Sequence, residues 1–137
     1  MKEFIRKLVP TFLLNIYHYN MALFSAVLFW FPSKDLNVIG ITGTSGKSTT
    51  VDFITSILEE SGQKVASLSS IKLKIGEQEW KNQLKMTMPG RFKIQKFLRK
   101  AVREKCNYAV LEVTSQGILQ YRHKFINFKT VVFTNLT

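Results

Sequence analysis

The sequence predicts an α/β fold, a three-layer parallel sheet preceded by a hydrophobic N-terminal helix. Three observations support this prediction. From residue 37 onward, short β-branched runs alternate with helical patterns, which is typical of parallel strands joined by right-handed crossovers. A glycine-rich turn separates the first such strand from the first such helix. An uncharged apolar stretch, residues 11–31, precedes the whole pattern.

Length and composition limit the class of protein. The chain has 137 residues, of which 45% are hydrophobic, and a formal net charge of +11. This composition excludes a disordered tail, and the length suits one domain. The single cysteine, Cys106, excludes a disulfide framework and a cysteine-based zinc site, and it fits a reducing compartment. No cleavable signal peptide is evident.

Most of the positive charge lies in one segment. Residues 72–105 carry eleven basic and three acidic side chains. Such a segment attracts phosphate-rich ligands, acidic lipid or nucleic acid, although a solvated helix face explains it equally well.

Residues 11–31 have three interpretations: a membrane span, a buried core helix, or a helix in the membrane interface or docked on a partner. A helix of this length would measure about 31 Å and could cross a bilayer. However, Asn15, His18 and Asn20 lie near its middle, and a basic flank precedes it. If the following residues face the cytoplasm, a span would place that basic flank outside. We therefore favour the interfacial or docked helix.

The elements from residue 32 onward follow from local patterns. Pro32 ends the first helix, and residues 37–42 are a β-branched run typical of a buried strand. Residues 48–61 predict a helix that stops near Gly62. One face of that helix is formed by Val51, Ile54, Ile57, Leu58 and Ser61.

The second half of the chain continues the alternation. Residues 64–70 predict a second strand, residues 71–80 a β-hairpin, and residues 108–113 and 130–134 two further strands. Residues 91–105 predict an amphipathic helix that buries Ile94, Phe97, Leu98, Ala101 and Val102 and exposes Lys93, Lys96, Lys100 and Arg103. Because the pattern stops after the fourth of the alternating strands, we expect an unpaired sheet edge.

The strongest motif is GITGTSGKSTT, residues 40–50, between the first strand and the next helix. This is the context that a phosphate-binding loop requires, because glycines let backbone N–H groups converge on a phosphate at a helix N-terminus. Lys47 is predicted to reach the β- and γ-phosphates, and the Ser48 hydroxyl to bind Mg²⁺, with Thr49 close by. The spacing differs from GxxxxGK[ST], since Ile41 stands where the first glycine is expected. The motif predicts a P-loop NTPase-like fold.

A carboxylate at the end of another strand supports this interpretation. Residues 108–112 form an apolar run that ends in Glu112. In phosphate-loop folds such an acid lies beside the loop and holds the metal directly or through water. Taken alone, a glutamate at a strand end is more often a surface residue. Together with Lys47 and Ser48 it is favoured as a metal ligand.

These motifs resemble those of the Mur ligase family. Residues 42–49, TGTSGKST, are similar to the family's TGTNGKTT, residues 112–115 to its EVSS, and residues 133–137 to its FTNL[ST]. The UDP-N-acetylmuramoyl-tripeptide synthetase branch is the most similar, because its Gln and Arg match the spacing of Gln120 and Arg122, and residues 87–89 resemble its TTP element. The resemblance divides the chain into a hydrophobic leader, 1–36, and the N-terminal portion of a central ATP-binding domain, 37–137.

The resemblance implies a role for each matching residue. Lys47 would be the catalytic residue, and Ser48 and Glu112 would bind Mg²⁺. ATP would be bound by Gly43, Thr44, Ser45, Gly46, Lys47, Ser48 and Thr49. The UDP-muramoyl substrate would be held by Thr87, Ser115, Gln120 and Arg122, although Gln120 and Arg122 could also be a solvated helix end. Four positions differ from the family pattern: Ser45, Ser48, Met88 and Gln116 stand where Asn, Thr, Thr and His are usual.

The implied reaction is ATP-dependent amide-bond formation in peptidoglycan precursor synthesis. A substrate carboxylate would attack the γ-phosphate to give an acyl phosphate, and an amine would then displace phosphate. The implied partners are a UDP-muramoyl peptide and an amino acid, and no nucleic acid is expected. The implied location is the cytoplasm, with contact to the inner face of the membrane through residues 11–31. Because residue 137 precedes the family's Asp-His motif, we expect a fragment that binds ATP without forming amide bonds alone.

Three alternatives remain open at this point. A folylpolyglutamate-synthase-like ligase has a similar loop, although Gln120 and Arg122 favour the muramoyl branch. The chain could instead be an ATP-binding module without ligase activity. It could also be a basic protein that binds membranes or nucleic acid, in which the glycine-rich loop has no role in binding. The acceptor amino acid does not follow from these residues.

Overall fold

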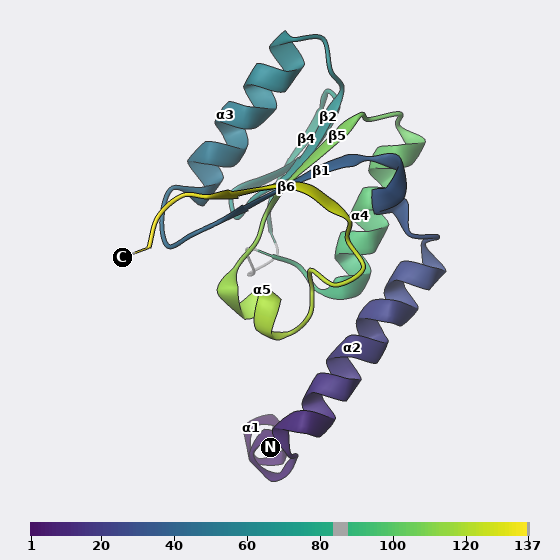
Figure 1. The fold of residues 1–137 in the computed structure, drawn as a ribbon, viewed down its shortest axis with the longest axis vertical. Helices are drawn as coiled ribbons and strands as arrows, with labels where there is room; N and C mark the ends of the chain where they lie inside the picture. The colour runs from purple at the N-terminus through teal and green to yellow at the C-terminus, as the bar shows by residue number, and fades with distance from the viewer. Residues whose placement is uncertain (84–87, 137) are drawn as a thin grey trace.

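A single mixed sheet forms the centre of the computed structural model, which describes residues 1–83 and 88–136 (Figure 1). Its strands are β1 (Asn37–Thr42), β2 (Val65–Leu68), β3 (Lys72–Ile75), β4 (Gln78–Lys81), β5 (Tyr108–Glu112) and β6 (Phe128–Phe133). The helices are α1 (Lys2–Leu8), α2 (Thr11–Leu28), the 3₁₀-helix η1 (Pro32–Asp35), α3 (Lys47–Glu60), α4 (Arg91–Arg103) and α5 (Ser115–Leu119).

The strand order is β4-β3-β2-β5-β1-β6. Four strands, β2, β5, β1 and β6, are mutually parallel, and β3 and β4 add an antiparallel hairpin at one edge. The register pairs Ile41 with Glu112 and Thr42 with Phe133. The ends of β1, β5 and β6 therefore meet at one edge of the sheet, directly beside the glycine-rich loop. The predicted α/β fold with a mostly parallel sheet is confirmed.

Helices cover both faces of the sheet. On one face, Val51 of α3 packs with Ile41, Val65 and Val110 of the strands. On the other face, α4 contributes the larger part of the core, including Ile94, Phe97, Leu98 and Ala101. The predicted inward face of residues 91–105 is correct, and the four basic residues predicted to be exposed are exposed. The sheet therefore separates α3 from α4 (Figure 1).

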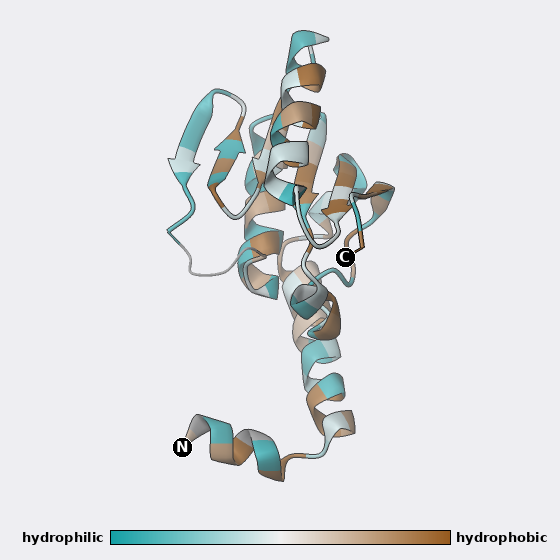
Figure 2. Cartoon of the chain, turned by 90° about the vertical axis from the view of Figure 1, so that its left-hand side faces the viewer, coloured by the Kyte–Doolittle hydropathy of each residue, from teal (hydrophilic) through white to brown (hydrophobic). Residues whose placement is uncertain are grey.

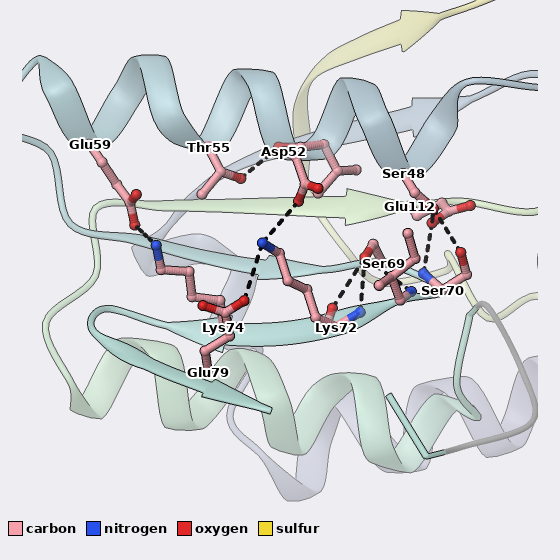
Figure 3. A network of polar contacts seen from close by, with 12 residues as sticks. Ser48, Asp52, Thr55, Glu59, Ser69, Ser70, Lys72, Lys74, Glu79 and Glu112 are labelled. Carbon is pink, nitrogen blue, oxygen red and sulfur yellow. Dashed lines mark hydrogen bonds and ion pairs between the residues drawn. The ribbon is translucent and has the colours of Figure 1, made fainter. Parts of the chain in front are cut away.

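The inward face of α3 differs from the prediction at two of its five residues. Ile57, which is 67% exposed, and Ser61, which follows the helix, are both exposed, whereas Thr55 is buried. Thr55 can be buried because its hydroxyl donates a 2.7 Å hydrogen bond to the carbonyl of Val51 one turn earlier. The polar side of α3 is tied to the hairpin by Lys72, whose ammonium lies 3.5 Å from Asp52 and 3.2 Å from Glu79 (Figure 3).

The hydrophobic stretch forms a long helix, α2, that ends at Leu28 and not at residue 31. Only Ala22, Ser25 and Ala26 of this helix are buried, so the interpretation as a buried core helix is wrong. No helix in the described ranges is long and apolar enough to cross a membrane. After α2 the chain turns through Trp30 and Phe31, whose φ angles are 61° and 47°.

Candidate functional site

The glycine-rich loop, residues 43–46, joins the end of β1 to the start of α3. Gly43 and Gly46 have φ angles of 137° and 78°, which side chains other than glycine rarely tolerate. A Cβ at Gly43 would also lie 2.0 Å from the Thr134 hydroxyl oxygen. No side chain caps the first turn of α3. Its backbone N–H groups are therefore oriented to bind an anion, which the helix dipole also attracts.

Lys47 is the first residue of α3, and its ammonium donates a 2.9 Å hydrogen bond to the carbonyl of Gly43. This contact folds the lysine side chain back over the loop that it follows. Because an ammonium has three N–H donors, the bond to Gly43 leaves donors for a phosphate. The phosphate contact of Lys47 itself stays a prediction.

Ser48 and Glu112 lie side by side although they come from different elements (Figure 3). The Ser48 hydroxyl donates a 2.9 Å hydrogen bond to Glu112 Oε2 and lies 2.7 Å from the Ser70 hydroxyl. The backbone N–H of Ser70 donates to the same carboxylate oxygen at 2.8 Å. Glu112 is only 3% exposed. A carboxylate and two hydroxyls are hard oxygen ligands of the kind Mg²⁺ prefers, so the residues fit that ion.

The sheet explains why these side chains meet. Glu112 is the last residue of β5, next to Ile41 near the end of β1, and Ser70 follows β2 on the other side of β5. Ser70 was not predicted as a site residue. The signal for it was present, because Ser69 and Ser70 end the strand predicted over residues 64–70, although the strand itself stops at Leu68. Carboxyl ends of parallel strands meet at one edge, where ligands bind in such sheets.

A second unpredicted contact holds the loop from the other side. Asn135 Oδ1 accepts hydrogen bonds from the Thr44 hydroxyl, at 2.6 Å, and from the Ser45 N–H, at 3.0 Å. Its Nδ2 donates to the Ser45 hydroxyl at 2.9 Å, and the Thr134 hydroxyl donates to the Ser45 carbonyl at 2.8 Å. Residues 133–137 formed one of the motifs that carried the family resemblance, but no role followed for Asn135. The structure shows that it braces the loop.

The residues predicted to hold the substrate form a second group. Arg122 donates to Gln120 Oε1 at 2.6 Å and to the Met88 carbonyl at 2.5 Å. Gln120 stands at the end of α5, and both residues are half-buried. Arg91, which was not predicted, donates to the Gln120 carbonyl at 3.0 Å. Burial lowers the pKa of the Arg122 guanidinium, and the positive charge of Arg91 acts in the same direction. Two neighbouring guanidinium groups favour an anionic ligand.

Ser115 is exposed at the first turn of the short helix α5, which follows β5. The Thr114 hydroxyl caps this helix by accepting a 3.0 Å hydrogen bond from the Gly117 N–H. Thr87, the remaining residue predicted to bind substrate, lies outside the described residues. In the described ranges, no cluster of three or more His, Cys, Asp or Glu side chains is placed to hold a metal ion.

Comparisons with known proteins agree with the motifs. A family model described as the Mur ligase middle domain matches residues 41–137. The UDP-N-acetylmuramoyl-L-alanyl-D-glutamate--2,6-diaminopimelate ligase of Syntrophomonas wolfei is 38% identical over 117 residues, which cover 85% of this chain and 24% of that protein. The UDP-N-acetylmuramyl-tripeptide synthetase of Roseiflexus sp. is 33% identical over 120 residues, 85% of this chain and 23% of that protein.

A solved structure shows the same fold. It is a UDP-N-acetylmuramoyl-L-alanyl-D-glutamate--2,6-diaminopimelate ligase, with a TM-score of 0.66 and 25% identity, and the match covers 74% of this chain and 20% of that one. The chain thus spans about a quarter of the length of the curated relatives it matches.

Proposed function

Because the chain belongs to the Mur ligase family, through its middle domain, we propose that it is the ATP-binding part of a ligase that adds an amino acid to a UDP-muramoyl peptide. The observation that carries this proposal is the convergence of the loop, Ser48 and Glu112 at one edge of the sheet. The names of the relatives support the muramoyl substrate over a folate substrate. Residues 37–137 form this part, and residues 1–36 are a leader.

The loop and Lys47 bind and orient the triphosphate of ATP. Backbone N–H groups at the start of α3 and the Lys47 ammonium supply positive charge where negative charge develops on the γ-phosphate. The substrate carboxylate attacks the γ-phosphorus, ADP leaves, and an acyl phosphate forms. The amine of the incoming amino acid then attacks the acyl carbon, and phosphate is released. No side chain of this part acts as a nucleophile, so its residues contribute by positioning and electrostatics.

Mg²⁺ would supply charge neutralisation on the phosphate oxygens during this transfer. Ser48 and Glu112 would hold it, and Ser70 fixes the orientation of the carboxylate by donating from its backbone N–H. Thr44, Ser45 and Thr49 would complete the contacts of the loop and first helical turn with ATP. Gly43 and Gly46 allow the close approach that those contacts require.

The second group of residues would bind the anionic substrate. Arg122 and Gln120 already contact each other, and Arg91 adds a second guanidinium beside them. Ser115, and Thr87 from the family resemblance, would add hydroxyl contacts. We place this reaction in the cytoplasm, where ATP is available, with residues 11–31 in contact with the inner face of the membrane.

The proposal is tested by calorimetric titration of the chain with ATP in the presence of Mg²⁺. Lys47→Ala should abolish binding, because it removes the ammonium that contacts the loop. Lys129→Ala is the matched control, since Lys129 is an exposed lysine on β6, and it should bind ATP as the parent does. Equal ATP affinity in the Lys47→Ala variant and the parent would contradict the proposal.

A further inference from the structure

The N-terminal helices present apolar side chains to solvent instead of to the core. In Figure 2, α1 and α2 project from the body of the molecule and carry hydrophobic residues along their length. Phe4 and Leu8 of α1 are each 70% exposed. Scattered exposed apolar residues are ordinary, whereas a continuous exposed apolar face marks an interaction surface.

The apolar face of α2 is opposite the face that packs on the protein. Ala22, Ser25 and Ala26 are buried on the inner side, where small side chains allow close approach. At helical periodicity, the side facing away carries residues that are each 45–59% exposed: Leu13, Ile16, Tyr17, Phe24, Val27 and Leu28. Tyr17 contacts α4, since the Arg91 guanidinium lies 5.9 Å from the centre of its ring, and Leu28 lines a hollow beside α4. The other four side chains of this outer face are about half exposed to solvent.

Basic groups of α4 lie next to this apolar face. A hollow of about 630 Å³ is lined by Leu28, Phe29 and Trp30 on one side and by Phe92, Lys96 and Arg103 on the other. Arg99 joins the two sides, donating to the Phe29 carbonyl at 2.8 Å and to the Trp30 carbonyl at 3.0 Å. Trp30 itself is 82% exposed. The end of α2 and the basic side of α4 thus form one surface.

The basic surface continues toward the hairpin. A second hollow of about 640 Å³ is lined by apolar residues, including Trp80 and Phe97, and by lysines. Lys96 lines both hollows, so the two lie on either side of this residue. The Lys100 ammonium lies 4.6 Å from the centre of the Trp80 ring. No acidic side chain is present anywhere in α4, whose sequence is RFKIQKFLRKAVR.

We propose that the outer face of α2 and the basic side of α4, together with Trp30, dock on the surface of an anionic lipid bilayer. We refer to these residues as the docking surface. Apolar side chains would enter the interfacial region, tryptophan prefers that depth, and lysines would contact acidic headgroups. The charge of α4 is complementary to anionic lipid. This inference extends the membrane contact proposed for residues 11–31 and does not depend on ATP binding.

The geometry leaves the phosphate loop accessible in the docked state. The loop lies at the edge where the parallel strands end, and α3, which follows it, covers the opposite face of the sheet from α4 (Figure 1). Nucleotide can therefore reach Lys47 while α4 faces the bilayer.

The test is co-sedimentation of the full chain with two vesicle preparations, phosphatidylcholine alone and phosphatidylcholine mixed with phosphatidylglycerol. The chain should bind the mixed vesicles more tightly, and added salt should weaken this binding. Phe24→Glu should abolish binding, because it places a charge on the apolar face. Phe53→Glu is the matched control, since Phe53 is 65% exposed on α3, on the other side of the sheet, and it should bind as the parent does.

The charge contribution is tested separately by reversing single lysines. Lys93→Glu and Lys96→Glu should each weaken binding to the mixed vesicles about fivefold or more. Lys129→Glu, on β6, should have no such effect. Circular dichroism of each variant verifies folding, and Lys47→Ala should bind vesicles normally, which separates this proposal from the ATP-binding one.

Three outcomes would overturn the inference. One is the absence of binding to either vesicle preparation. Another is equal loss of binding in Phe24→Glu and Phe53→Glu. The third is a stable oligomer in lipid-free buffer that Phe24→Glu dissociates, because this would assign the apolar face to a second copy of the chain.

Discussion

The hydroxyl of Ser48 donates a 2.9 Å hydrogen bond to Glu112 Oε2, which links the start of α3 to the end of β5 across 64 residues of sequence. The carboxylate is nearly inaccessible to solvent and also accepts the backbone N–H of Ser70. Both donors are neutral, so the negative charge of Glu112 is not cancelled by these partners. A buried carboxylate whose donors from Ser48 and Ser70 are neutral, beside a phosphate loop, is well placed to attract a cation.

We therefore expect Glu112→Gln to reduce the effect of Mg²⁺ on ATP binding. Glutamine has almost the same shape, and its carbonyl oxygen can still accept the Ser70 N–H, so the fold should be retained. Calorimetric titration with ATP, with and without Mg²⁺, should show that the gain in affinity due to Mg²⁺ falls by about tenfold or more. Glu77→Gln, at an exposed position in the hairpin, is the control. An undiminished Mg²⁺ effect in Glu112→Gln would refute the assignment.

Asn135→Ala should loosen the phosphate loop. The substitution removes hydrogen bonds to the Thr44 hydroxyl and to both the N–H and the hydroxyl of Ser45. The free energy of unfolding should fall by about 1–2 kcal/mol. ATP affinity should fall about tenfold, because ATP must then order the loop as it binds. Asn127→Ala, at an exposed position before β6, should change neither quantity. Parent-like ATP affinity in Asn135→Ala would show that the loop is ordered without this brace.

Leu98→Ala tests the core beneath α4. Leu98 is fully buried against strands of the sheet, so truncation leaves a cavity. The free energy of unfolding, measured with denaturant, should fall by about 2–5 kcal/mol. Leu119→Ala makes the same chemical change at a position that is 75% exposed, and its effect should stay within about 0.5 kcal/mol. Similar losses in the two variants would mean that α4 is not packed as described.

His123 should make the fold less stable in mild acid. Burial lowers the pKa of its imidazole, and the positive charge of Lys124 acts in the same direction. A hydrogen bond with the backbone of Gly117 raises this pKa, but the lowering effects are larger. An unfolded histidine titrates near pH 6.5. As the pH falls through that value, the unfolded chain takes up a proton that the folded chain resists, so stability decreases until the folded pKa is reached.

The measurement is the melting temperature of parent and His123→Gln from about pH 8 to about pH 5. The variant should lose less stability than the parent over this range, because it lacks the titrating group. Both proteins share every other titrating group, so the difference between the two curves reports on His123. An identical pH dependence in the two proteins would exclude a contribution from His123.

The order and type of most elements could be predicted because each depends on nearby residues. The β-branched run of β1, the glycine loop and the apolar spacing of α4 are all visible within a few residues of sequence. The proximity of Ser48 and Glu112 was also predictable, since parallel strands end at a common edge. Their role in binding metal stays a prediction.

Contacts between distant segments were not predictable from local patterns. The brace from Asn135 reaches a loop 90 residues earlier, and Arg91 meets Gln120 from another helix. The exposure of Ile57 could not be predicted from the helical spacing of apolar residues. That spacing shows which residues share a face, but it does not show how much of the face the sheet covers. The end of α2 at Leu28 depends on the left-handed conformations of Trp30 and Phe31, which apolar residues rarely adopt.

The position of β1 between β5 and β6 has a consequence for how the protein is made. During synthesis, β1 and the phosphate loop leave the ribosome long before either neighbouring strand exists. Thr134, whose hydroxyl donates a hydrogen bond to the carbonyl of Thr42, is synthesised 92 residues later. Meanwhile the edges of β1 are unprotected in the nascent chain. Such long-range pairing slows folding. Chaperone binding to β1 during translation should therefore be released once β6 has emerged.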